Sequence, residues 1–210
     1  MGKKLGICCI ILGMICILAS VGLICYNRYE SRSGAESSRN LLQNVQAQIK
    51  EEPQNNAGLQ ETPTEETIPE APEENPPREM VTVPVGDYDS IGILSIPVLE
   101  LELPVLTDWS YPKLKKAPCH YYGSCYESDF VIAAHNYPAH FGRLSELRQG
   151  DLVVFTDGAG EVHCYAVVLL ETLLPTATEE MITSGFDLSL YTCTPGGGNR
   201  VTVRCVRMDN

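Results

Sequence analysis

The chain has 210 residues, which suggests one folded domain with appended segments, and its 27 acidic and 15 basic side chains give a formal net charge of −12. Residues 1–84 contribute 7 − 11 = −4 and residues 85–210 contribute 8 − 16 = −8. Because neither part carries a basic patch, the composition argues against a nucleic-acid partner, and an acidic outer domain is not expected to lie flat on an anionic membrane.

Residues 6–26 form an almost wholly apolar run without a charge. At about 1.5 Å per residue, a helix of this length just spans the ~30 Å of membrane hydrocarbon. A cleaved signal peptide is the alternative, but the run is long for one and no clean small-residue cleavage site follows it. A lipoprotein signal fits poorly, because Ile24 precedes Cys25 where a small residue is expected. We therefore predict that residues 1–28 are a cytoplasmic tail and an uncleaved transmembrane anchor.

Basic residues flank the span on both sides, so the positive-inside rule favours one orientation only weakly. They are Lys3, Lys4, Arg28 and Arg32. The very short N-terminal tail and the large C-terminal domain favour an N-terminus inside the cell. We expect a single-pass protein of the cell membrane with an extracytoplasmic folded domain.

Residues 29–84 are predicted to be an extracytoplasmic, Glu/Pro-rich spacer. Apolar residues recur at helical spacing in residues 37–50, which form either a short amphipathic helix or an unstructured segment. Residues 51–79 hold nine Glu and six Pro with one Arg, and such a composition cannot bury a core. We expect an extended, self-repelling spacer that lets the folded domain reach across the wall near the membrane.

Residues 85–210 carry many short strand patterns separated by turn signals, with few helical patterns between them. The alternation in residues 99–103 is typical of a half-buried strand, and Asp157-Gly-Ala-Gly is typical of a hairpin turn. About 125 residues can bury a real core, so the predicted fold class is all-β: a closed barrel with short helices, preceded by one transmembrane helix. The expected strands cover residues 91–96, 99–105, 130–135, 152–155, 162–170, 188–192 and 201–206.

The nine cysteines raise the question of disulfides. Four lie in the span and five lie outside it. Because five is an odd number, at least one of these five is unpaired. The five are Cys119, Cys125, Cys164, Cys193 and Cys205. Cys119 and Cys125 flank a short turn and could pair, whereas Cys164 and Cys205 lie in apolar strand patterns typical of core residues. Cys119, His120 and Cys125 also form half of a metal-site pattern, but no second pair of ligands is evident, so no metal is predicted.

Cys193 ends a short apolar strand pattern and is followed by a proline and three glycines, which place it at an exposed rim. Arg200 opens the returning strand. In a hairpin the two ends lie side by side, so Cys193 and Arg200 are expected to be neighbours. A guanidinium beside a thiol favours the thiolate, the form that attacks carbonyl carbons. The alternative is a buried cysteine with an ordinary surface arginine.

A thiol nucleophile needs a base, and His135 is the best placed of the four histidines. It ends the apolar run of residues 130–134 and is followed by Asn136-Tyr-Pro, which stops a strand. His135 and Cys193 thus each stand at a strand end, 58 residues apart (193 − 135). The other three are expected on the surface or in loops, with the second as the rival base: His120, His140 and His163.

Together these residues resemble the sortases, a family of membrane-anchored cysteine transpeptidases of Gram-positive bacteria. The family carries Thr-Leu-x-Thr-Cys at its nucleophile, and residues 189–193 read Ser-Leu-Tyr-Thr-Cys. The family histidine ends a strand, often after glycine; here Ala134 precedes His135. Arg200 matches the family arginine that opens the next strand. The resemblance covers residues 87–208, and its two departures are small-for-small changes that leave the subclass open.

The resemblance implies a barrel of about eight strands and transpeptidation at a C-terminal sorting signal of the Leu-Pro-x-Thr-Gly type. Cys193 would attack the Thr carbonyl to form a thioacyl enzyme, and His135 would protonate the leaving amine and deprotonate the incoming one. Arg200 would steady the oxyanion or orient the signal, and the sequence does not separate these roles. Three further residues are expected to contact substrate: Thr192, Ala134 and Asn136.

The implied partners are proteins with sorting signals, an amine acceptor, and the membrane reached through the N-terminal helix. The acceptor is either a peptidoglycan precursor of the cell wall or a pilin lysine. No cofactor or metal is required; some sortases use calcium, and the acidic residues here do not decide that dependence. The loop at residues 173–186 is expected to set substrate choice, because it joins two strands that flank the nucleophile and is long for a barrel connection.

Two other functions fit parts of the pattern. A cell-wall cysteine peptidase would hydrolyse its substrate, although such enzymes usually place the cysteine before the histidine. An inactive membrane-anchored binding module could use the same barrel. Selective alkylation of Cys193 at neutral pH separates an enzyme from a module, and product analysis with and without an added amine separates transfer from hydrolysis.

Overall fold

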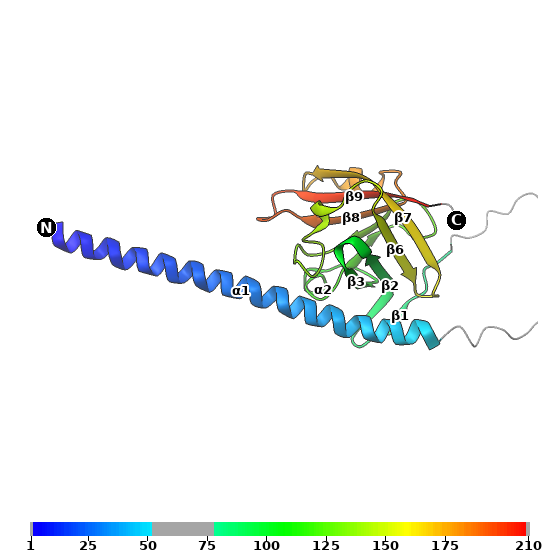
Figure 1. Cartoon of the computed structure of the whole chain (residues 1–210), viewed down its shortest axis with the longest axis horizontal. Coiled ribbons are helices and arrows are strands. Elements are labelled where there is room, and N and C mark those ends of the chain that lie inside the picture. The colour runs from blue at the N-terminus through cyan, green and yellow to red at the C-terminus, as the bar shows by residue number, and fades with distance from the viewer. Residues whose placement is uncertain (1, 52–77, 209–210) are drawn as a thin grey trace, which may run out of the picture.

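The computed structural model describes residues 2–51 and 78–208 and shows a β-barrel with one long helix packed along its side (Figure 1). The helical elements are α1 (Gly2–Glu51), η2 (Pro97–Leu99), α2 (Tyr111–Leu114), η3 (Leu144–Glu146) and α3 (Thr178–Ile182). The strands are β1 (Val83–Val85), β2 (Tyr88–Ile96), β3 (Leu101–Leu106), β4 (Cys119–Tyr122), β5 (Phe130–Ala133), β6 (Leu152–Asp157), β7 (Val162–Leu173), β8 (Leu188–Cys193) and β9 (Arg200–Arg207).

Strands β2 to β9 close into an eight-stranded barrel, and β1 adds to one edge of β2. The neighbour order is β1-β2-β3-β4-β5-β8-β9-β7-β6, and pairing of β2 with β6 closes the ring. Most neighbours are antiparallel, but β3 pairs with β4, and β5 with β8, in parallel. The prediction of an all-β closed barrel of about eight strands, preceded by one long apolar helix, is confirmed.

The barrel interior is filled by apolar side chains that alternate with outward-facing ones along the strands, as the period of two requires. Phe130 of β5 and Phe155 of β6 meet edge to face at the centre, with ring centroids 5.1 Å apart. Such an aromatic pair adds about 0.5–1.5 kcal/mol beyond the area that it buries. The two phenylalanines therefore tie opposite sides of the barrel together and fix the strand that leads to His135.

The second half of α1 packs on the outside of the barrel. Val45 is fully buried in a cluster with Val85, Ile93 and Leu106. The helix thus continues unbroken to Glu51, far beyond residue 28, because its apolar face is covered by the barrel and tertiary packing stabilises helices. The expected extended spacer lies largely outside the described residues, in residues 52–77.

All eight described cysteines are unpaired, from Cys9 in the apolar run to Cys205 in β9. Cys119 and Cys125, for which a disulfide was an open possibility, are two separate buried thiols. The Cys119 thiol lies 3.5 Å from the backbone oxygen of Ala117. Burial raises the pKa of both thiols to about 12, so each stays protonated at neutral pH.

Candidate active site

The parallel pairing of β5 and β8 brings two strand ends to the same place. Ala133, the last residue of β5, is paired with Tyr191 of β8, and His135 and Cys193 each follow their paired residue by two positions. The Ala134 amide donates to the Tyr191 oxygen over 3.1 Å, which extends the pairing one step past the strand. Because both chains run in the same direction, His135 and Cys193 emerge side by side at one end of the barrel.

His135 is half-buried, and its ring stacks on Tyr137 with centroids 4.7 Å apart and planes 14° from parallel. Burial lowers the pKa of His135, the nearby Lys115 ammonium lowers it further, and the Glu30 carboxylate partly opposes this. The imidazole is therefore neutral at pH 7. A neutral ring held by stacking can accept a proton from a thiol beside it.

The hairpin of β8 and β9 places Arg200 directly opposite Cys193, as the sequence predicts. One guanidinium nitrogen, Nη1, donates to the backbone oxygens of Gly197 and Asn199 over 3.3 and 3.2 Å. These bonds tie the side chain to the turn at residues 194–199. Among the described residues, Nε and Nη2 have no hydrogen-bond partner, so two donors stay available beside the thiol.

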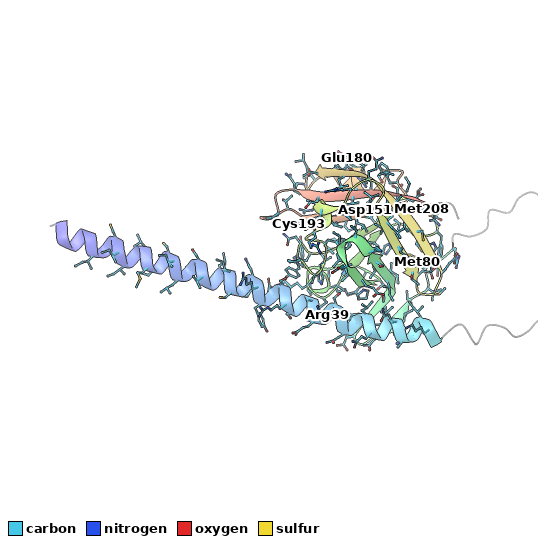
Figure 2. All side chains as sticks on the ribbon, viewed as in Figure 1. Arg39, Met80, Asp151, Glu180, Cys193 and Met208 are labelled. Atoms are coloured by element: carbon cyan, nitrogen blue, oxygen red, sulfur yellow. The ribbon has the colours of Figure 1, made fainter. Side chains whose placement is uncertain are left out.

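A cavity of about 240 Å³ opens over these strand ends, and we call it the cleft. His135, Cys193 and Arg200 all line it, together with Ala134. Its other walls come from the loop after β3, from α2, from β4 and β8, and from α3 with the segment before it. They include Trp109, Tyr111, Tyr121, Tyr191, Leu174 and Met181. Figure 2 shows Cys193 at the end of the barrel from which the free half of α1 extends.

The three residues expected to contact substrate lie in different surroundings. Ala134 lines the cleft. Thr192 is buried, and its hydroxyl donates to the Ala134 oxygen over 2.8 Å, so this side chain fastens β8 to the segment before His135. Asn136 lines a second hollow between α1 and the barrel, next to Asn27 and Glu30.

Of the remaining histidines, His140 lies in a loop as expected, whereas His120 and His163 lie in β4 and β7. His140 is fully buried without a hydrogen-bond partner among the described residues, and burial lowers its pKa to about 4. His163 is 5% exposed and faces Asp157. His120 is half-buried, with its ring nitrogens 3.1 and 2.8 Å from the backbone oxygens of Thr107 and Gly123. None of the three lines the cleft.

The structure contains a second group with a thiol, an imidazole and a carboxylate, which was not predicted from the sequence. The thiol of Cys125, the carboxylate of Asp157 and the ring of His163 lie within 4.8 Å of one another, all buried inside the barrel wall. A metal ion could take these three ligands only by displacing hydrogen bonds, because Asp157 already accepts from the Tyr126 hydroxyl and two backbone amides. Nothing in residue spacing signals this group, since its members come from three segments.

Burial sets the chemistry of this second group. Burial opposes ionisation of Asp157, but hydrogen bonds from Tyr126, Glu161 and His163 outweigh it and hold the pKa of the carboxyl below its usual value. The neighbouring Cys125 thiol has no exposed surface. The group therefore ties the β6–β7 turn to the loop after β4, whereas a nucleophile must be reached by substrate.

Comparisons with known proteins agree with this geometry. A family model described as "Sortase domain" matches residues 94–208, which is more than half of the chain. A search of curated proteins finds no match. Several solved structures share the fold.

Sortase A from Corynebacterium diphtheriae is 24% identical, with a TM-score of 0.53 over 59% of this chain and 63% of that one, so this chain spans less than two thirds of its length. Sortase C1 from Streptococcus agalactiae is 28% identical, with a TM-score of 0.51 over 58% and 68%. Sortase C1 from Streptococcus suis is 31% identical, with a TM-score of 0.51 over 58% and 74%. With its barrel topology and the family-model match over more than half of its length, the chain belongs to the sortase family.

Proposed function

We propose that the chain is a cysteine transpeptidase in which Cys193 is the nucleophile, His135 the proton carrier and Arg200 the oxyanion or substrate donor. The observation that carries this proposal is the convergence of the three side chains in one cleft, at the ends of β5, β8 and β9. The cleft is open to solvent, unlike the buried group around Cys125. Of these two groups, the cleft is the one that can admit a polypeptide to its thiol.

In the first half of the reaction, Cys193 passes its proton to the neutral His135 ring as its sulfur attacks the peptide carbonyl carbon. The carbonyl oxygen becomes an oxyanion, which the free Nε and Nη2 donors of Arg200 can stabilise. The carbon–nitrogen bond then breaks, His135 returns the proton to the leaving amine, and the acyl group stays on the sulfur. In the second half, an incoming amine loses a proton to His135 and attacks the thioester, which releases the Cys193 thiol.

The proposed substrate is a C-terminal sorting signal of the Leu-Pro-x-Thr-Gly type, and the acceptor is an amine of a cell-wall precursor or a pilin lysine. The support is family membership together with a cleft whose walls are aromatic and aliphatic. Such walls suit apolar side chains of an extended peptide. Leu174 and Met181, from the predicted specificity loop at residues 173–186, contribute to these walls.

The proposal also places the chain in the cell membrane, with its N-terminus inside and its barrel outside. Within the described residues, α1 is the one helix long and apolar enough to cross a membrane. The sortase family is extracytoplasmic, and this supports the orientation.

A panel of sorting-signal peptides, incubated with the full chain with and without an added amine, tests the proposal. We expect Cys193-dependent cleavage of at least one peptide and a new amide when the amine is present. Hydrolysis that the amine does not divert would favour a peptidase. No cleavage, together with a Cys193 thiol that resists alkylation at neutral pH, would favour an inactive binding module.

A further inference from the structure

The helix α1 changes its surroundings sharply at Glu30. Every side chain described between residues 6 and 29 is exposed, whereas from Glu30 onward the barrel covers one face of the helix, with Gly34, Ser38 and Val45 buried. The apolar run ends at Tyr26, so contact with the barrel begins four residues later. One continuous helix carries both parts, and this fixes the height of the barrel above the apolar run.

The distance from the end of the apolar run to the first helix residue covered by the barrel is short. At ~1.5 Å per residue, Glu30 lies about 6 Å beyond Tyr26 along the helix axis. The headgroup layer on each side of a bilayer is roughly 5–7 Å thick. If residues 6–26 span the hydrocarbon, Glu30 stands near the outer edge of the headgroups, and little room remains between the barrel and the lipid.

The part of the barrel that α1 meets first is the cleft end. The Lys115 ammonium contacts the Glu30 carboxylate over 2.5 Å. A methyl group on Gly34 would stand 3.0 Å from the Lys115 backbone oxygen and from the ring of Tyr137, which itself stacks on His135. In Figure 2, Cys193 lies on the side of the barrel toward the free half of α1, and Met208 lies on the opposite side.

The rim of the cleft carries side chains suited to a bilayer surface. Trp109, Tyr111 and Leu174 line the cleft and are 44%, 73% and 65% exposed. Tryptophan and tyrosine favour the level of the headgroups, where an apolar ring and a polar edge are both accommodated. The three lysines of residues 85–210 follow Trp109 within seven residues, although the rest of the domain is acidic: Lys113, Lys115 and Lys116. Lys113 is paired with Asp108 and Lys115 with Glu30, so Lys116 is the one of the three without an ion pair among the described residues.

We propose that the cleft end of the barrel, formed by Trp109, Tyr111, Leu174 and the turn at residues 194–199, rests on the bilayer in which α1 is anchored. This proposal depends on the membrane anchoring that is part of the proposed function. It adds a second contact with lipid, made directly by the barrel. The docked part of α1 sets the height of the barrel. A polypeptide reaches Cys193 along the bilayer surface.

The single tryptophan of the chain makes the surface testable without a label. The full chain is reconstituted in vesicles of phosphatidylcholine and phosphatidylglycerol, with lipids brominated near the headgroup as fluorescence quenchers. We expect Trp109 to be quenched at least about twofold more strongly than a tryptophan at the opposite end of the barrel. The matched control for that position is the double variant Trp109→Phe, Met208→Trp.

A second pair of variants tests whether the docked helix sets the position. Gly34→Leu introduces a side chain where the Lys115 backbone and Tyr137 leave no space, whereas Gly22→Leu adds the same side chain where nothing lies within 4 Å. We expect weaker Trp109 quenching in Gly34→Leu and unchanged quenching in Gly22→Leu. Circular dichroism verifies that the barrel remains folded in both.

The outcomes separate the two proposals. A chain that does not float with the vesicles overturns the anchoring and this surface together. A chain that floats, but whose Trp109 is quenched no more than the tryptophan of the Met208→Trp control, overturns the surface and leaves the transpeptidase proposal intact. Equal quenching in Gly34→Leu and Gly22→Leu would show that α1 docking does not set the position.

Discussion

Two regions of this barrel contain a cysteine and a histidine close together, and they differ in almost every physical respect. Cys193 and His135 stand at strand ends, half-exposed, on the wall of a cleft. Cys125 and His163 are buried with Asp157, inside a closed set of hydrogen bonds. The residue types of the buried group match those of a thiol protease triad, yet access and solvation favour the other group. Exposure, more than residue type, separates a reactive thiol from a structural one.

Replacing each of the two cysteines by alanine should give the largest difference between the two regions. Cys193→Ala removes the attacking atom, and we expect kcat/KM on a sorting peptide to fall on the order of 10⁴-fold or more, with little change in melting temperature. Cys125→Ala leaves a small void in a packed wall and should cost about 1–2 kcal/mol of stability, with activity retained. Kinetics and thermal melting of both variants provide the measurement. Loss of activity in a folded Cys125→Ala would reverse our assignment.

Two arginines on β9, Arg200 and Arg204, differ in the same way: one lines the cleft and the other is buried. Arg200 faces the cleft with two free donors, whereas Arg204 is 2% exposed and donates to Glu171 over 2.7 Å and to Ser189 over 2.8 Å. Arg200→Lys keeps the charge but loses the planar fork, and we expect a fall of about 10²–10³ in kcat/KM at unchanged stability. Arg204→Lys, the matched control, should lose about 2 kcal/mol of stability and keep its turnover.

The variant Arg200→Ala distinguishes two roles for this side chain. If Arg200 acts by geometry, the Lys and Ala variants should be almost equally impaired, and alkylation of Cys193 should keep its dependence on pH. If charge alone matters, Lys should restore most of the activity. Turnover like that of the wild type in Arg200→Ala would remove Arg200 from the site and leave Cys193 with His135.

A third test uses His140. This side chain is buried, as the group around Cys125 is, but it has no hydrogen-bond partner among the described residues. Its pKa falls from the ordinary value near 6.5 to about 4 on folding, so the unfolded chain binds the proton more tightly. Stability is therefore full above pH 6.5 and is lost as the pH falls toward 4, by about 3 kcal/mol. Denaturant unfolding between pH 4 and 7 should show this slope. His140→Gln should flatten it, and an equal slope in that variant would contradict the assignment.

The sequence was most informative about residues at strand ends. Cys193, His135 and Arg200 could be predicted together because each ends or begins a strand beside a turn, and local patterns report such positions well. The parallel pairing of β5 with β8, which brings His135 next to Cys193, is a long-range contact. No local pattern in the sequence predicts such a pairing.

Interior features were harder to predict, because they depend on packing between distant segments. The helical spacing in residues 37–50 left open whether they fold, and the barrel surface that covers Val45 decides it. His140 lies in a loop, as expected, and His163 in β7, but both are buried, since no local signal marks a histidine that a neighbouring segment will bury. The group around Cys125 likewise joins segments more than thirty residues apart.

The smallest expected effect concerns the wall of the cleft, where exposure should again decide which side chain matters for function. Leu174 lines the cleft and is 65% exposed, while Leu169, five residues earlier on β7, is 42% exposed and lies outside the cleft. Leu174→Ala removes apolar surface that a bound peptide would cover, so we expect KM for the preferred peptide to rise about three- to tenfold with kcat nearly unchanged. Leu169→Ala should change neither. Exchanging residues 173–186 for the corresponding loop of another sortase should then shift the peptide preference, because Leu174 and Met181 both belong to that segment. A preference that stays with the barrel after the exchange, together with an unchanged KM in Leu174→Ala, would locate substrate choice in another part of the cleft wall, such as Trp109.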